Sequence, residues 1–149
     1  MTVFLPGTEI AAKLEQEFPE SIVESSENNI IVKSEALLQI ASFLKTAPEL
    51  HFDYLNSITA VDYHSHFEVV YHLTSTVHNH SLMLKVRVND RKNPMVPSVV
   101  SLWCGADFQE REIYDLFGIR FEGHPNMKRI FLWEGFPGNP LRKDYQDAS

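Results

Sequence analysis

Cysteine is almost absent from the sequence, since Cys104 is the only one among 149 residues. An intramolecular disulfide is therefore excluded, which favours a reducing, cytosolic setting. Cys104 stands among apolar neighbours in SLWCG, so we expect a buried small side chain, with a nucleophilic thiol as the alternative. The N-terminus lacks the basic start and apolar stretch of a signal peptide. No apolar run approaches the roughly 18 residues that a membrane-spanning helix needs.

Basic residues are also scarce, with 13 Lys and Arg against 20 Asp and Glu and a net charge of -7. A general nucleic-acid-binding protein needs a basic face, and attachment to anionic lipids needs a polybasic segment. The sequence favours neither function. Its 44% apolar content is ordinary for a globular protein, and its length predicts one domain.

Recognisable catalytic motifs are missing as well. The sequence contains no glycine-rich phosphate loop, no serine nucleophile elbow and no cysteine–histidine signature. One cysteine cannot ligate an iron–sulfur cluster. We therefore assign no catalytic residue, no cofactor-binding residue and no metal ligand to this chain.

Histidine offers the one alternative to that assignment, because five of the seven histidines lie between positions 64 and 80. They are His64, His66, His72, His78 and His80. Residues i and i+2 of a strand share a face, so the HSH and HNH pairs are possible metal-binding pairs. The only acids nearby are Asp62 and Glu68. Polar residues at hairpin ends are the simpler interpretation, and a stand-alone metal-dependent enzyme is the alternative.

Periodicity and turn residues predict nine elements in the order α-β-β-α-β-β-β-α-α. The helices are expected at Thr8–Phe18, Ser34–Lys45, Ser98–Trp103 and Asp107–Phe117. The strands are expected at Ser21–Glu24, Asn29–Lys33, Phe52–His64, Phe67–Ser75 and Ser81–Asn89. The last two strands alternate apolar and polar residues, which is typical of an antiparallel sheet with one wet face. The fold class is therefore α+β in two layers, a mainly antiparallel sheet with helices on one face and an extended C-terminal tail.

The last long helix carries a start and a stop signal. Asp107 is the expected N-cap, with Glu110 as its capping-box partner, and Gly118 is the expected left-handed residue at the end. Glu110 and Glu112 stand about 200° apart on a helix and so point to nearly opposite sides. That spacing does not suit a pair of catalytic carboxylates and favours ion pairing or docking. We expect Arg111 to pair locally with Glu110 or with Asp115.

The residues after Gly118 form a stretch broken by glycine and proline that is nevertheless rich in large apolar side chains. These are Ile119, Phe121, Ile130, Phe131, Leu132, Trp133, Phe136, Leu141 and Tyr145. A disordered tail should lack such residues, and burying each one is worth roughly 1.5–3 kcal/mol. We therefore divide the chain into a compact domain, 1–118, and an extended docking tail, 119–149. We expect 121–132 partly against the domain and 133–145 largely on a partner.

Charge also separates the helix from the tail. Residues 107–115 carry four acids and one base, whereas residues 128–144 carry four bases and two acids. We therefore expect the helix and the basic residues of the tail to contact each other or to share a partner surface.

The stretch DFQEREIYDLFGIRFEGHPNMKRI, followed by PLRKDY, resembles the signature of the C subunit, the 30 kDa subunit, of proton-pumping NADH-quinone oxidoreductase, respiratory complex I. The likeness extends from Phe52 to Tyr145, and Met127-Lys128 departs mildly from it. The matching positions are Glu110, Arg111, Glu112, Tyr114, Asp115, Gly118, His124, Pro125, Arg129, Pro140, Leu141, Arg142, Lys143, Asp144 and Tyr145. We take these positions, except Gly118, as the signature and docking residues, together with Trp133.

The resemblance implies a subunit of the peripheral arm, on the cytoplasmic side of the cell membrane. Such a subunit binds no flavin or cluster, and FMN, iron–sulfur clusters and quinone belong to other subunits. It packs on the D subunit, the hydrogenase-like subunit beside the quinone site, and on neighbouring iron–sulfur subunits. Electron transfer from NADH to quinone and proton translocation are activities of the whole complex, and none is expected from this chain alone. The alternative is the equivalent subunit of a ferredoxin-fed or membrane-bound hydrogenase complex.

Overall fold

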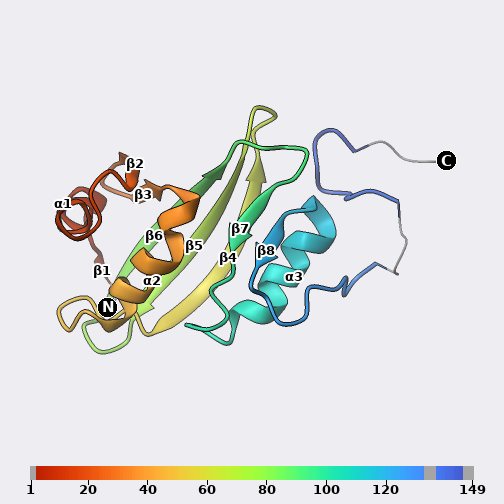
Figure 1. Cartoon of the computed structure of the whole chain (residues 1–149). Helices are drawn as coiled ribbons and strands as arrows, with labels where there is room; N and C mark the ends of the chain where they lie inside the picture. The colour runs from red at the N-terminus through yellow and green to blue at the C-terminus, as the bar shows by residue number, and fades with distance from the viewer. Residues whose placement is uncertain (1–2, 133–136, 146–149) are drawn as a thin grey trace.

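The computed structural model of the chain describes residues 3–132 and 137–145. A sheet with three helices along one side forms its centre (Figure 1). The elements are β1 (Val3–Phe4), α1 (Gly7–Glu17), β2 (Ile22–Ser25), β3 (Asn29–Val32), η1 (Ser34–Ala36), α2 (Leu37–Thr46), β4 (Tyr54–Asp62), β5 (Phe67–Ser75), β6 (His80–Val88), β7 (Met95–Pro97), α3 (Ala106–Phe117) and β8 (Arg120–Glu122). None of the helices in these two ranges is both long enough and apolar enough to cross a membrane.

The main sheet has the strand order β2-β3-β6-β5-β4. Strands β4, β5 and β6 form two consecutive antiparallel hairpins, whereas β3 and β1 both pair parallel to β6. The predicted α+β class and the mainly antiparallel sheet are confirmed. The parallel pairing joins β1 and β3 to the hairpins. Helix α2 connects β3 to β4 and crosses the sheet (Figure 1).

Side chains on one face of the sheet build the core. Val69, Tyr71 and Leu73 of β5 point to the helices and are almost fully buried. The opposite face was expected to be wet, but Glu68 and Val70 are only 5% and 8% exposed. Strand β5 has a neighbour on each side, so the side chains of those neighbours cover its second face. The simple alternation of buried and wet faces is therefore wrong for this strand.

Several element boundaries differ from the prediction for local reasons. The expected helix at Ser98–Trp103 is a series of turns after β7, in which Trp103 donates its indole N–H to the carbonyl of Phe52 (3.1 Å). Strands β7 and β8 were not predicted, because three residues give no detectable period and their partner strand is distant in sequence. Cys104 is exposed in the turn before α3, so the expectation that it is buried is wrong.

Gly7 generates a stability prediction, because a Cβ atom there would lie 2.2 Å from the carbonyl oxygen of Ser26 and 2.6 Å from that of Asn29. Both neighbours are backbone atoms and cannot move away cheaply. We expect Gly7→Ala to lower the free energy of unfolding by about 1–3 kcal/mol in urea denaturation. Gly105→Ala is the matched control, since a Cβ there meets nothing within 4 Å. Equal stability of the two variants would contradict the prediction.

Candidate functional site

The signature residues lie around α3, and Glu110 is the first of them. Its side chain is fully buried, and its carboxylate accepts hydrogen bonds from the hydroxyl of Ser98 (2.6 Å) and from the N–H of Val99 (2.8 Å). Burial raises the pKa of Glu110 above its usual value. The capping-box prediction is wrong, because α3 begins after Gly105 without a side-chain cap. Glu110 instead attaches the turn after β7 to the helix.

Asp115, five residues further along α3, is also fully buried. Its Oδ2 atom accepts hydrogen bonds from the N–H groups of Ile130 (3.2 Å), Phe131 (2.8 Å) and Leu132 (3.1 Å). Its Oδ1 atom pairs with Nε of Arg129. Burial alone would raise the pKa of Asp115, but the guanidinium and the amides outweigh it and hold the pKa below its usual range. Asp115 therefore stays ionised and organises the start of the tail's apolar segment.

Arg129 connects the helix to a second, later part of the tail. Its Nη2 atom donates to the carbonyl of Asp115 (2.9 Å) and to the carbonyl of Gly138 (2.8 Å). Arg111 donates from Nε to the carbonyl of Lys128 (3.1 Å). The expected contact between the acidic helix and the basic tail is thus confirmed. The expected pairing of Arg111 with Glu110 or Asp115 is not observed, and its guanidinium lies over the ring of Phe108, 5.5 Å from the centroid.

The tail also caps the C-terminal end of α3. Gly118 has a φ of 80°, which confirms the predicted left-handed end of the helix. The side-chain amide of Asn139 donates to the carbonyls of Tyr114 (3.4 Å) and Asp115 (3.0 Å). The backbone N–H of Leu141 donates to the carbonyl of Leu116 (2.9 Å). Carbonyls in the last turn of a helix have no partner within it, so the tail supplies donors that the helix lacks. Sequence reasoning missed Asn139, whose place between glycine and proline indicates only a turn.

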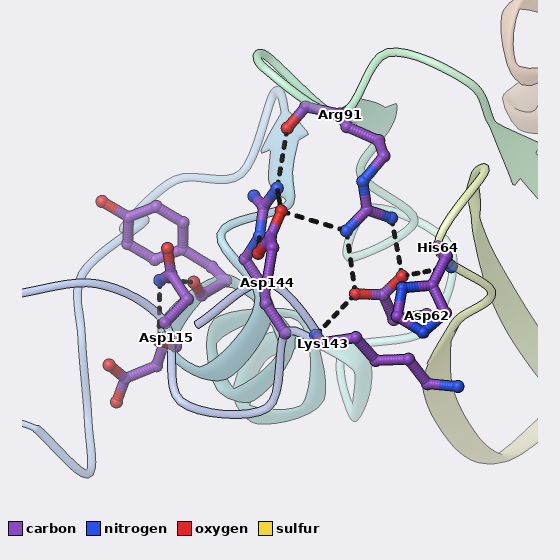
Figure 2. Close-up of polar contacts among 9 residues, drawn as sticks. Asp62, His64, Arg91, Asp115, Lys143 and Asp144 are labelled. Atoms are coloured by element: carbon purple, nitrogen blue, oxygen red, sulfur yellow. Dashed lines mark hydrogen bonds and ion pairs between the residues drawn. The ribbon is translucent and has the colours of Figure 1, made fainter. Parts of the chain in front are cut away.

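A network of four charged side chains holds the last described residues (Figure 2). Arg142 forms two hydrogen bonds with Asp144, at 2.8 and 2.9 Å. Arg91 reaches the same carboxylate (3.2 Å) and binds Asp62 through two further bonds, at 2.6 and 3.0 Å. Asp62 also accepts the backbone N–H of Lys143 (2.8 Å). We call Asp62, Arg91, Arg142 and Asp144 the ion-pair network.

An aromatic ring supports the network. The guanidinium carbons of Arg91 and Arg142 lie 4.5 and 5.1 Å from the centroid of Phe67. The hydrogen bonds from Arg91 hold the pKa of Asp62 well below its usual range, and those from Arg142 lower the pKa of Asp144 to about 2. In the sequence, Asp62 stands out only as an acid near the histidines, and no pattern singles out Arg91. Neither residue lies in the matching motif, so no local signal connects them to it.

The remaining signature residues divide into tethered and exposed positions. His124 has a buried ring that lies 2.9 Å from the carboxylate of Asp107. Tyr145 packs closely against Gly138, where a Cβ atom would lie 2.9 Å from the ring. The exposed positions are Glu112, Pro125, Leu141 and Lys143. Pro140 is half-buried, and Trp133 lies outside the described residues.

We expected residues 133–145 to lie largely on a partner. Of this stretch, residues 137–145 are hydrogen-bonded to the body of the same chain through Asn139, Leu141, Arg142 and Lys143. Ile119 and Phe121 are buried in the core. The boundary between domain and tail at Gly118 stays a prediction. The side chains that remain available to a partner are the exposed ones, above all Phe131 and Leu141, which are 64% and 54% exposed.

The histidines engage backbone carbonyls and neighbouring side chains. Nε2 of His78 lies 2.6 Å from the carbonyl of Pro48, and Nε2 of His80 lies 2.7 Å from that of Leu50. His66 lies 3.5 Å from the carboxylate of Glu68. In residues 3–132 and 137–145, no group of three or more His, Cys, Asp or Glu side chains is placed to hold a metal ion.

The buried carboxylate of Asp115 generates the second prediction. Asp115→Asn keeps the size of the side chain but removes the negative charge that pairs with Arg129 and weakens the bonds to three amides. We expect the free energy of unfolding to fall by about 3 kcal/mol. Glu112→Gln, an exposed change on the same helix, is the control and should alter stability little. Urea denaturation measures both, and limited trypsin digestion should cleave the tail faster in Asp115→Asn alone.

The ion-pair network generates a pH prediction. The pKa of Asp144 is about 2 in the folded chain against an ordinary value of 3.8, and that of Asp62 is also lowered. The unfolded chain therefore binds protons first as the pH falls, so stability is present above about pH 4 and is lost toward pH 2. We expect Asp62→Asn to be less stable at neutral pH and to lose less stability over this range. Thermal unfolding between pH 2 and 7 tests this, and an unchanged acid slope would contradict it.

Comparison with known proteins gives concordant findings over most of the chain. The profile of the family described as respiratory-chain NADH dehydrogenase, 30 Kd subunit, matches residues 30–149. The C subunit of NADH-quinone oxidoreductase from Roseiflexus castenholzii is 42% identical over 147 residues, which are 94% of this chain and 84% of that protein. The mitochondrial NADH dehydrogenase [ubiquinone] iron-sulfur protein 3 of Candida albicans is 42% identical over 142 residues, 93% of this chain and 50% of that protein.

Two further matches come from a longer protein and from a different respiratory membrane complex. The C/D subunit of NADH-quinone oxidoreductase from Phocaeicola vulgatus is 44% identical over 106 residues, 70% of this chain but 20% of that protein. A solved structure of the membrane-bound sulfane sulfur reductase, an archaeal respiratory membrane complex, contains a chain that matches with a TM-score of 0.70 and 28% identity. The match covers 93% of this chain and 85% of that one. The matching profile, the identity to the C-subunit proteins and the shared fold place this chain in the family of the 30 kDa subunit of respiratory-chain NADH dehydrogenase.

Proposed function

We propose that this chain is a cofactor-free structural subunit of the peripheral arm of NADH-quinone oxidoreductase. The observation that carries the proposal is that the signature residues bind their own chain: Asp115 and Arg129 hold the tail against α3, and Arg142 and Asp144 hold it against Arg91. Electron transfer from NADH to quinone, coupled to proton translocation, is the activity of the whole complex. FMN, iron–sulfur clusters and quinone belong to other subunits in this proposal.

The proposed partner is the hydrogenase-like D subunit. The relative from Phocaeicola vulgatus is named as one C/D chain, which supports a lasting association of the two parts in that protein. On this chain, exposed apolar groups such as Phe131 and Leu141 stand on a backbone that is already fixed. Binding by a prearranged surface costs less conformational entropy than binding by a disordered tail. Adjacent iron–sulfur subunits are further proposed partners, and the complex holds the chain on the cytoplasmic side of the cell membrane.

A second candidate is the equivalent subunit of a ferredoxin-fed or membrane-bound hydrogenase complex. The fold shared with a chain of the sulfane sulfur reductase complex favours it, since that complex is not named for NADH. The identity to that chain is 28%, against 42% to the C-subunit protein of Roseiflexus castenholzii, so we prefer the NADH-quinone oxidoreductase. Mass spectrometry of the subunits that co-purify from the native membrane separates the two, because other subunits determine the electron donor.

Docking by the tail is best tested with exposed side chains rather than by deletion. Removing residues 133–149 would also remove Asn139 and Arg142 and so would destabilise α3 itself. We expect Leu141→Asp with Lys143→Glu to weaken binding to the purified D subunit by at least about tenfold, because both side chains are exposed beside the capped helix. Isothermal titration calorimetry measures the affinity, and circular dichroism confirms the fold.

The matched control reverses charges elsewhere, with Lys13→Glu and Lys33→Glu, both exposed and outside the tail. The control should bind the D subunit as the unaltered chain does. Arg142→Glu should also weaken binding, but together with a lower melting temperature, because Arg142 belongs to the ion-pair network. Unaltered affinity of the Leu141 and Lys143 variant would contradict docking through this face.

A further inference from the structure

A pocket of about 370 Å³ lies beside the start of the tail, between the loop from β6 to β7 and the loop from α3 to β8. Its lining residues are Lys92, Asn93, Pro94, Met95, Gly118 and Arg120. Two of them are charged, and both are cations. On a chain with a net charge of -7, a pocket lined by cations without an acid runs against the overall charge.

The two cations are held in place through their backbones and keep exposed side chains. The N–H of Arg120 donates to the carbonyl of Pro94 (3.0 Å), and Arg120 pairs with Met95 between β8 and β7. The carboxylate of Asp90 accepts the N–H groups of Lys92 and Asn93, both at 3.0 Å, and so fixes that loop. Neither Lys92 nor Arg120 takes part in an ion pair among residues 3–132 and 137–145.

Three other pockets of the described chain lack this charge pattern. The larger pocket beside η1 combines Lys33 and Arg87 with Glu35 and Asp90, so its charges offset one another. The pocket within the tail is lined by Arg142 and Asp144, which are paired with each other. The pocket between α3 and β4 has Glu112 as its charged lining residue. An anionic group is therefore favoured at Lys92 and Arg120 and at none of these.

Met95 adds an apolar requirement to the charge. It lines the same pocket, and its side chain is 45% exposed. A free anion would leave this side chain in water, whereas a polypeptide with a carboxylate and an adjacent apolar side chain would cover both. We propose that the pocket receives an acidic segment of the partner subunit, with an Asp or Glu carboxylate between Lys92 and Arg120 and an apolar neighbour over Met95.

The position of the pocket argues for the same partner that the tail would bind, and the inference rests on the proposed function. Gly118, on one wall, lies against Asn139: a Cβ atom there would be 2.7 Å from its Oδ1 atom. On the other wall, the carbonyl of Arg91, next to Lys92, accepts a bond from Arg142 (3.0 Å). The pocket and the tail therefore form one continuous surface that a single partner can cover.

The test measures the affinity of the full chain for the purified D subunit at low and at high salt. We expect Lys92→Glu with Arg120→Glu to weaken binding about tenfold or more at low salt and to reduce its salt dependence. Lys13→Glu with Lys33→Glu carries the same change in charge and should bind as the unaltered chain does. Lys92→Arg with Arg120→Lys keeps the charge and should retain the affinity. If the reversed pair does not fold, Lys92→Gln with Arg120→Gln is measured instead.

The outcomes separate this inference from the proposed function. If the unaltered chain does not bind the D subunit, the proposed function fails. If it binds and the Lys92 and Arg120 variants bind equally well, the pocket assignment is overturned and the proposed function stands. A parallel sedimentation experiment measures binding of the chain and its variants to vesicles of phosphatidylserine and phosphatidylcholine. Vesicle binding that the variants lose, with unchanged affinity for the D subunit, would assign the pocket to lipid headgroups and overturn the inference.

Discussion

The buried ion pair between Asp115 and Arg129 is the interaction on which the shape of the C-terminal third depends. A carboxylate in a protein interior is costly unless charges and hydrogen bonds compensate it. Here the guanidinium of Arg129 and three consecutive amides supply that compensation. The same Arg129 binds the carbonyl of Gly138, so one pair determines where the tail leaves the helix and where it returns.

Around this pair, the signature residues act mainly within the chain. Glu110 attaches the turn after β7, and Arg142 and Asp144 bind Arg91, which in turn binds Asp62. A motif whose sequence looks like a charged contact surface therefore binds mostly to its own chain. The exposed remainder is small and includes both charged and apolar side chains, such as Lys143 and Leu141, and the internal bonds determine its position.

Local sequence patterns predicted the elements that have a clear period or a strong stop signal. The hairpin strands and Gly118 are examples, since alternation and a left-handed glycine are properties of a few adjacent residues. The bond between Lys143 and Asp62 joins residues 81 positions apart, and no short pattern reports it. Glu110 was assigned to a capping box because its spacing fits one, but the hydroxyl of Ser98 offered a buried alternative. The resemblance singled out a set of positions, and the structure shows what several of them bind.

Because Asp62 and Lys143 lie far apart in the sequence, the bond between them can form only late in synthesis. Translation proceeds from the N-terminus, and domains form as units while the chain emerges. Strand β4 and Arg91 are therefore available well before Arg142 and Asp144 can reach them. The surface beside α3 is complete only after residues 142–144 have left the ribosome and closed onto the body. A copy that stops before them would lack this closure and the bonds that Arg142, Lys143 and Asp144 make to the body.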